Sequence, residues 1–192
     1  PFAFNPSEID IVFVTHAHAD HIGRLPKLVK DGFQGRIICT PPTADLMRVM
    51  LTDALKIMRH ECEYLNEPML YEEHDLENML KRAEPHLYDE SFSIGSGISV
   101  TLRDSAHILG SCMVEMTIDD MIVVFTGDLG NTPAPLLKDI YRIPTCDYLI
   151  MESVYGNRVH EHIDNRKEIL ERAIEDTVTR KGTLVIPILA LE

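Results

Sequence analysis

The sequence predicts a layered α/β protein in which helices cover β-sheets. Two patterns indicate this class. Short apolar runs rich in β-branched residues are typical of buried strands, and longer segments with an apolar residue every three or four positions are typical of amphipathic helices. The composition agrees, since 45% of the 192 residues are apolar and 26% are charged. That balance is ordinary for a globular domain and excludes a disordered tail, a collagen-like chain and a coiled coil.

The first half of the chain alternates between predicted strands and helices. Ile9 to Thr15 and Arg36 to Thr40 are short apolar runs that predict two buried strands, and Asp20 to Lys30 between them has helical spacing. Pro41-Pro42 opens a second helix, because proline is tolerated in the first turn. A third, acidic helix is predicted around Asp75 to Ala83. The apolar stripe of the second helix consists of Leu46, Met47, Met50, Leu51, Ala54 and Met58.

Beyond Pro85 the pattern changes to strands joined by tight turns. The turns are predicted at Gly95-Ser96-Gly97 and Asp119-Asp120. A last helix is predicted from Asp164 to Arg180, with Ile169 and Ile174 among the residues facing inward. The predicted strands are Ser91 to Ile94, Ile98 to Arg103, Ser111 to Ile118, Met121 to Thr126, Tyr148 to Met151 and Leu184 to Ile188.

The net charge restricts the binding partners that the chain can attract, and the cysteine pattern indicates the redox state of its cellular compartment. Thirty-one acidic and 18 basic residues give a net charge of −13, which argues against broad attraction to nucleic acid or an anionic membrane. A polyanionic substrate remains compatible if bound metal ions supply local positive charge. No apolar run reaches the roughly 18 residues of a membrane span, so we expect no membrane partner. Four scattered cysteines without a C-x-x-C pair predict reduced thiols in a cytoplasmic protein.

The strongest chemical signal is a histidine cluster directly after the first predicted strand. His16, His18, Asp20 and His21 lie within six residues. Imidazole and carboxylate are standard ligands of first-row metals, and convergent ligands at a strand end favour a preformed site. A purely structural zinc site would favour cysteine ligands and closed four-coordination. The cluster therefore predicts a catalytic metal site.

Two further residues are predicted to complete this site. His107 follows the strand that ends near Arg103, and Asp128 follows the strand that ends at Thr126. Small residues flank both positions, as expected where the backbone approaches a metal centre closely. Either residue alone would more often be structural, but the cluster at 16–21 favours a ligand role.

These motifs resemble those of a known superfamily. H-x-H-x-D-H at 16–21, the lone His107 and Gly-Asp-Leu-Gly-Asn at 127–131 are similar to the metallo-β-lactamase superfamily, an αββα hydrolase fold. Glu152 to Arg158 resembles the E-S-T-Y-G-[DN]-R segment of the β-CASP branch, a group of RNA-processing nucleases. Residues 182–187 and 190–192 resemble the opening strand of the β-CASP insert. The resemblance implies a metallo-β-lactamase domain over residues 1–156 and the start of a β-CASP domain over 157–192.

The resemblance also implies a role for each motif residue. Asp20 and Asp128 would orient the nucleophile, and Glu152 would orient a catalytic histidine of the insert. The family often has glycine where this chain has Ala106, which would tighten that loop. The implied metal ligands are His16, His18 and His107 for one zinc ion, Asp20 and His21 for a second, and Asp128 as the bridge between the two.

The resemblance implies a zinc-dependent phosphodiester hydrolase acting on RNA. An endonuclease and an exonuclease both stay open, as do a preference for DNA and a homodimer. The alternative is a hydrolase of the same fold acting on a small ester, thioester or lactam, which would use the same ligands. A scaffold subunit without activity would be expected to have lost ligands, and residues 16–21 have lost none.

The resemblance further implies that the chain is a piece of a longer protein. The family's opening strands would precede Pro1, and its last zinc-binding histidine and the general acid would follow Glu192, so we expect this piece to be incomplete for activity. The remaining histidines have simpler interpretations. His60, His74 and His86 are expected on the surface, and His160-Glu161-His162 is expected in a solvated loop.

Overall fold

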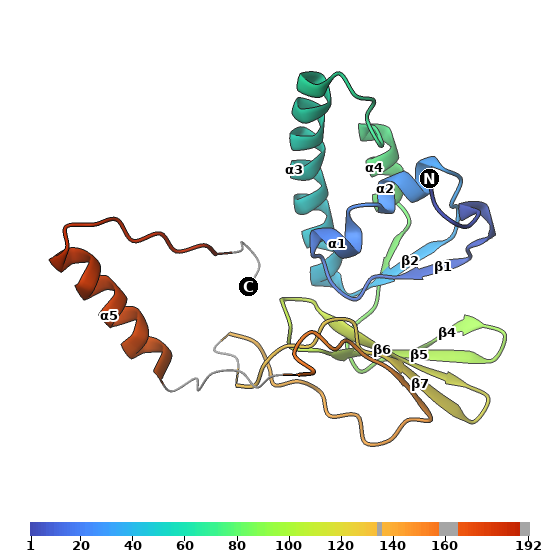
Figure 1. Ribbon diagram of the computed structural model, residues 1–192. Helices are drawn as coiled ribbons and strands as arrows, with labels where there is room; N and C mark the ends of the chain where they lie inside the picture. Colours follow the sequence, from blue (N-terminus) through green and yellow to red (C-terminus); the bar gives the residue numbers. More distant parts are fainter. Residues whose placement is uncertain (134–135, 158–164, 189–192) are drawn as a thin grey trace. The chain divides into compact units, whose positions relative to one another are not determined.

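The computed structural model describes residues 1–133, 136–157 and 165–188. The chain divides into two compact units, Pro1–Glu152 and Ser153–Glu192. Figure 1 traces the elements of both units in chain order. The first unit contains every residue that the sequence predicts as a metal ligand.

A parallel three-stranded sheet forms the first part of unit Pro1–Glu152. Its strands lie in the order β1-β2-β3, and its helices gather on one side of it (Figure 1). A single 3-10 turn, Pro6–Glu8, precedes the first strand. The strands are β1 (Ile11–Phe13), β2 (Arg36–Cys39) and β3 (Ala83–Pro85). The helices are α1 (Ala19–Ile22), α2 (Leu25–Lys30), α3 (Pro41–Leu65) and α4 (Glu73–Leu80).

The structure corrects two of the predicted elements in this region. The single helix predicted over Asp20 to Lys30 is two helices, because the turn at Gly23 and Arg24 interrupts it. The third predicted helix ends at Leu80, and after Lys81 and Arg82 the residues Ala83–Pro85 form β3. This strand is too short to have its own pattern, and it exists because it pairs in parallel with β2.

The second sheet has five strands in the order β4-β5-β6-β7-β8. The first four pair antiparallel as consecutive neighbours, whereas β8 pairs parallel to β7. The strands are β4 (Ser91–Gly95), β5 (Ile98–Asp104), β6 (Cys112–Ile118), β7 (Met121–Phe125) and β8 (Tyr148–Ile150). All five were predicted within one or two residues. Positive φ angles at Gly95, Ser96, Gly97 and Asp119 confirm the two predicted turns.

Two apolar clusters hold the layers of this unit together. The larger lies between the helices and the first sheet, and it includes Phe33, Ile37 and Met47, each at most 1% exposed. The smaller is built on β5 and β6 around Leu102 and Val114, with Phe13 of β1 packed against it. Because Phe13 belongs to the first sheet, this cluster joins the two sheets face to face. The described residues of the unit thus form helix, sheet and sheet layers.

The described part of unit Ser153–Glu192 contains one helix, α5 (Arg166–Thr179). None of its residues is buried, and Ile169 and Ile174, predicted to face inward, are 54% and 44% exposed. The strand predicted over Leu184 to Ile188 is wrong, since these residues have no regular secondary structure. A strand needs a neighbour to satisfy its backbone groups, and the described residues of this unit offer none. No helix in the described part of the chain is long and apolar enough to span a membrane.

Candidate metal centre

The predicted ligands lie on loops that follow strand ends. His16 and His18 follow β1, and His107 lies between β5 and β6. Asp128 follows β7, and Glu152 follows β8. One backbone hydrogen bond joins the first two of these regions, because the Cys112 N–H donates to the Thr15 carbonyl at 2.7 Å. Segments almost 100 residues apart in the chain therefore meet at one place.

Three imidazole rings converge at this place. Nδ1 of His18 lies 3.1 Å from Nε2 of His16 and 3.1 Å from Nε2 of His107. A ring nitrogen has either one proton or one lone pair, so Nδ1 cannot form a good hydrogen bond with both neighbours. Two nitrogens bound to one zinc ion at about 2.0–2.1 Å in tetrahedral geometry lie roughly 3.3–3.4 Å apart. The observed spacing fits shared coordination of a metal ion better than hydrogen bonding.

Asp128 supplies a carboxylate oxygen to the same group. Its Oδ2 lies 3.7 Å from Nε2 of both His16 and His107. The four ligand atoms of His16, His18, His107 and Asp128 all lie within 4.8 Å of one another. Three nitrogens and one oxygen are a donor set that divalent zinc accepts.

The protonation state of His16 suits this role. Its side chain is completely buried, and this burial, together with the neighbouring His21, His107 and His18, lowers its pKa to about 3. His16 is therefore a neutral imidazole at pH 7, with a lone pair available to a cation. The Thr15 hydroxyl oxygen lies 3.1 Å from Nδ1 of His16, a contact that fixes the ring and leaves Nε2 toward the other ligands.

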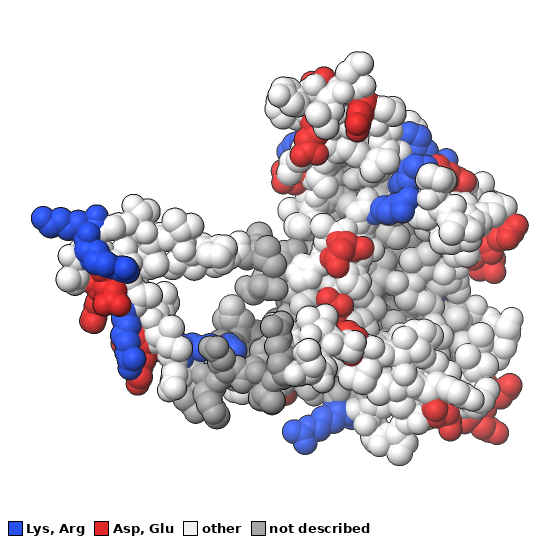
Figure 2. All heavy atoms as spheres, viewed as in Figure 1, with Lys and Arg blue, Asp and Glu red and all other residues white. Residues whose placement is uncertain are grey.

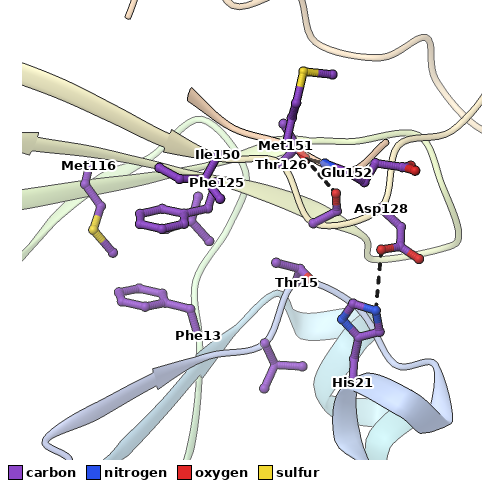
Figure 3. Close-up of a pocket in the computed structure, with 13 residues that line it drawn as sticks. Phe13, Thr15, His21, Met116, Phe125, Thr126, Asp128, Ile150, Met151 and Glu152 are labelled. Carbon is purple, nitrogen blue, oxygen red and sulfur yellow. Dashed lines mark hydrogen bonds and ion pairs between the residues drawn. The ribbon is translucent and has the colours of Figure 1, made fainter. Parts of the chain in front are cut away.

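His21 and Asp20 form a second set of donors beside the first. Nε2 of His21 lies 3.4 Å from Oδ1 of Asp128 and 3.6 Å from Oδ2 of Asp20. Figure 3 shows His21 pointing toward Asp128. The two oxygens of Asp128 thus face different sets, Oδ2 toward His16 and His107 and Oδ1 toward His21. The Asp20 side chain is 79% exposed, so this second set opens to solvent.

A network of hydroxyl groups that the sequence did not reveal holds the His107 loop. The Ser111 hydroxyl accepts hydrogen bonds from the backbone N–H groups of His107 and Ile108, at 3.0 and 3.2 Å. The Thr40 and Thr43 hydroxyls, at the start of α3, both donate to the carbonyl of Gly110, at 2.6 and 2.9 Å. The only sequence signal was that small and hydroxylated residues cluster near His107.

Ala106 and Gly130 explain why small residues flank the ligands. Ala106 has a φ of 56°, in the left-handed region that favours glycine, which agrees with the tightened loop expected there. A Cβ atom on Gly130 would lie 1.6 Å from the Ala106 carbonyl oxygen. The Gly130 N–H donates to the Ser105 carbonyl at 2.9 Å. The Asp128 and His107 loops therefore touch backbone to backbone, and only glycine fits at position 130.

A cavity of about 510 Å³ adjoins the second donor set (Figure 3). One end is polar and contains His21, Asp128 and Glu152, and the remaining wall is mainly apolar. The apolar side chains come from both layers: Phe13 from β1 and Val14 directly after it, and Val114, Met116, Phe125 and Ile150 from the second sheet. Figure 3 shows Phe13 and Phe125 on opposite sides of this space.

The other histidines are distributed largely as expected. His60 and His74 are exposed. His86 is not a simple surface residue, because its ring stacks on Phe92 at 3.6 Å and Nε2 lies 2.8 Å from a carboxylate oxygen of Glu84. The sequence could not predict this contact between the residue after β3 and a residue of β4. Arg158, residues 160–162 and residues 190–192, which belong to the motifs and loop predicted from the sequence, lie outside the described residues.

Comparisons with known proteins agree with the motifs. A family profile described as "Anti-Pycsar protein Apyc1" matches residues 2–179. Ribonuclease TTHA0252 of Thermus thermophilus is 37% identical over 193 aligned positions, covering 100% of this chain and 42% of the relative. Transcription termination factor FttA of Methanococcus maripaludis is 36% identical, covering 98% of this chain and 30% of the relative. Endoribonuclease YSH1 of Eremothecium gossypii is 30% identical, covering 98% of this chain and 25% of the relative.

The chain thus spans less than half the length of each of these three relatives. The similarity nevertheless covers almost all of this chain, including both donor sets. It confirms the resemblance to β-CASP nucleases and the mixed α/β fold. The chain therefore belongs to the family described as Anti-Pycsar protein Apyc1 and is homologous to the N-terminal metallo-β-lactamase region of the β-CASP ribonucleases.

Proposed function

We propose that this chain carries the metal-dependent site of a phosphodiester hydrolase that acts on RNA. The observation that carries the proposal is the position of Asp128 between two donor sets. One carboxylate oxygen lies 3.7 Å from His16 and His107, and the other lies 3.4 Å from His21. A carboxylate with this arrangement is suited to bridge two cations, which is a common solution for phosphodiester hydrolysis.

We propose zinc as the metal, with two ions in the complete site. His16, His18 and His107 would hold one ion, Asp20 and His21 would hold the other, and Asp128 would bridge them. Bound zinc would supply Lewis acidity and the positive charge that a phosphodiester requires. Three imidazole nitrogens are typical zinc ligands, and no cysteine is among the donors.

The side chains of the site would have different roles in the proposed hydrolysis. His16 is buried and neutral, so it serves as a fixed ligand and does not exchange protons near pH 7. Asp20 is largely exposed and lies where a water molecule and the substrate would enter, so its carboxylate can orient the water and accept a proton. The apolar wall of the cavity excludes bulk water on one side of this position and strengthens the electrostatic interactions there.

The surface charge supports a metal-dependent means of holding the substrate. The net charge is −13, and Figure 2 shows Lys and Arg in small separate groups on the face in view. A polyanion would gain little from such a surface by long-range attraction. Positive charge concentrated at two metal ions would provide the attraction locally.

RNA is proposed as the substrate because two relatives carry the names of a ribonuclease and an endoribonuclease. We further propose that residues 1–156 belong to the metallo-β-lactamase domain and 157–192 to a β-CASP insert, and that the protein acts in the cytoplasm. The donor set alone is equally suited to a small ester, thioester or lactam, so the choice of substrate needs a direct test.

The test compares three substrates with the natural full-length polypeptide that contains this chain. Purified protein with saturating zinc is incubated with labelled single-stranded RNA, a chromogenic small phosphodiester and a chromogenic acetate ester. We expect chelator-sensitive cleavage of RNA and loss of that cleavage in His16→Ala. Hydrolysis of the ester alone, with RNA left intact, would contradict the proposed substrate class.

A further inference from the structure

Three hydrogen bonds connect the segment after β7 to the last residue of β8 and the segment after it. The Thr126 N–H donates to the Ile150 carbonyl at 3.0 Å, and the Glu152 N–H donates to the Thr126 hydroxyl oxygen at 3.3 Å. The Leu129 N–H donates to Oε1 of Glu152 at 2.7 Å. Figure 3 shows the contact between Thr126 and Glu152 next to Asp128. Because β7 and β8 are parallel, their carboxyl ends lie at the same edge, and this arrangement brings Glu152 beside the Asp128 loop.

The last of these contacts fixes the peptide that follows Asp128. At 2.7 Å this contact lies at the short end of the usual range for a hydrogen bond from a backbone N–H to an oxygen, so the Glu152 oxygen directly restrains the Leu129 peptide. On the other side of Asp128, Gly127 has a φ of 56° and packs closely against Thr15. Asp128 is therefore held from both sides, by backbone contact before it and by Glu152 after it.

This restraint matters because Asp128 must satisfy two donor sets at once. Its two oxygens lie 3.4–3.7 Å from ring nitrogens of His16, His107 and His21. A small shift of the loop would move one oxygen out of reach, since functional constellations need positions accurate to about 0.5 Å. The sequence assigned Glu152 no contact with this loop.

We propose that Glu152 is a positioning residue for the metal centre, acting on Asp128 through the Leu129 N–H. This inference rests on the proposed function, because it takes Asp128 to be a metal ligand. It differs from the role that the family resemblance implies for Glu152, which is to orient a histidine of the insert. The essential property of Glu152 here is the reach of its acceptor oxygen and not its negative charge.

Two conservative variants separate reach from charge. Glu152→Gln removes the charge but keeps an acceptor oxygen at the same distance along the side chain. Glu152→Asp keeps the charge but withdraws the oxygens by roughly one carbon–carbon bond, about 1.5 Å, so the Leu129 N–H loses its partner. The matched control is Glu115→Ala on β6, which removes a carboxylate paired with Arg103 at 2.8 Å in the same sheet.

The experiment measures Co²⁺ binding to the 192-residue chain by its visible absorption, because Zn²⁺ is silent in this range. Unfolding by urea, followed by circular dichroism, gives the stability of each variant. We expect Glu152→Asp to bind Co²⁺ roughly 10- to 100-fold more weakly, the usual cost of losing a residue that orients a metal ligand, with an altered spectrum. We expect Glu152→Gln to bind within a few-fold of wild type. Glu115→Ala should lose stability while keeping the wild-type spectrum.

The outcomes distinguish this inference from the proposed function. If the wild-type chain binds no Co²⁺, the metal-dependent function fails. If wild type binds but Glu152→Asp binds equally well with an unchanged spectrum, only the positioning role is wrong. If Glu152→Gln is as weak as Glu152→Asp, the charge of Glu152 controls binding and the inference is overturned.

Discussion

Nδ1 of His18 lies 3.1 Å from Nε2 of His107, although 89 positions separate the two residues in the chain. His18 follows a strand of the first sheet, and His107 lies on a loop of the second. The packing of the two sheets is therefore what brings the ligands together. The proposed metal centre and the contact between the two sheets are therefore the same part of the molecule.

This relationship predicts that His107→Ala abolishes tight metal binding. The variant removes one of three converging nitrogens, so the loss of zinc affinity should exceed the roughly 10- to 100-fold that follows loss of an orienting partner. Zinc titration against a chromogenic chelator measures the affinity. His60→Ala, on an exposed part of α3, is the control and should bind zinc like wild type. Equal affinity in the two variants would exclude His107 from the centre.

Asp20→Ala should abolish RNA cleavage by the natural full-length polypeptide with little effect on folding. The loss of a group that orients water and accepts a proton typically lowers the rate by about 10²–10⁴-fold. The side chain is 79% exposed in the first turn of α1, so stability should fall by only about 0.3–1 kcal/mol. Single-turnover cleavage and RNA affinity are measured separately, with Asp45→Ala as an exposed control near the start of α3. Cleavage by Asp20→Ala at the wild-type rate would contradict the mechanism.

Gly130→Ala tests the contact between the Asp128 and His107 loops. The new Cβ would overlap the Ala106 carbonyl oxygen, and relieving that overlap should cost at least about 1–3 kcal/mol of unfolding free energy. Zinc affinity should fall as well, because the two loops must move apart. Gly182→Ala is the control, since its nearest atoms lie 3.7 Å away and its stability should change by no more than about 0.5 kcal/mol. An unchanged melting curve for Gly130→Ala would refute the close approach.

Much of the fold could be predicted from the sequence because burial of one face of a helix or strand requires apolar residues at a regular spacing. The strands β4 to β7 were predicted closely, since each has alternating or continuous apolar residues and a turn at its end. The short strand β3 could not be predicted, because three residues are too few to show an alternating apolar pattern. Their conformation depends on the pairing with β2. Leu184 to Ile188 illustrates the opposite case, in which a strand-like run has no partner in the described residues and stays irregular.

The candidate ligands could be picked out for a different reason, which is that their chemistry is unusual in any loop. Three histidines and an aspartate within six residues have few structural explanations, so residues 16–21 predict a metal site without tertiary information, and the structure brings His16 and His18 together with His107 and Asp128. The residues that support the ligands were not predictable. Their side chains bind backbone groups, as Thr43, Ser111 and Glu152 do, and a side-chain contact with the backbone does not depend on which residue type it reaches. Such contacts therefore produce no recognisable sequence motif.

A pH-dependent stability effect is expected away from the metal centre, at Glu84. Two hydrogen bonds from Arg36, each 2.6 Å, lower the pKa of Glu84 to about 2, with a smaller contribution from His86. Because the folded pKa lies below the unfolded one, the pair stabilises the protein above about pH 4.5 and loses this effect as the pH falls toward 2. Since 39% of the side chain is exposed, Glu84→Gln should cost only about 0.5–1 kcal/mol at pH 7.

Urea unfolding of Glu84→Gln and wild type at pH 7, 4 and 3 checks this prediction. The difference in unfolding free energy should be largest at pH 7 and shrink steadily at the two lower values. Glu90→Gln, which changes an exposed carboxylate outside the Arg36 pair, controls for the loss of one negative charge. A difference that grows toward low pH would mean that the Arg36 pair does not stabilise the fold.

X-ray absorption of the zinc-loaded chain tests most directly whether His16, His18, His107 and Asp128 bind one metal ion together. We expect one tightly held zinc per chain, bound only by nitrogen and oxygen at about 2.0–2.1 Å, with the outer scattering pattern of several imidazole rings. The four cysteines should contribute nothing to the spectrum. Sulfur scattering at about 2.3 Å, or a bound zinc without imidazole scattering, would contradict the account.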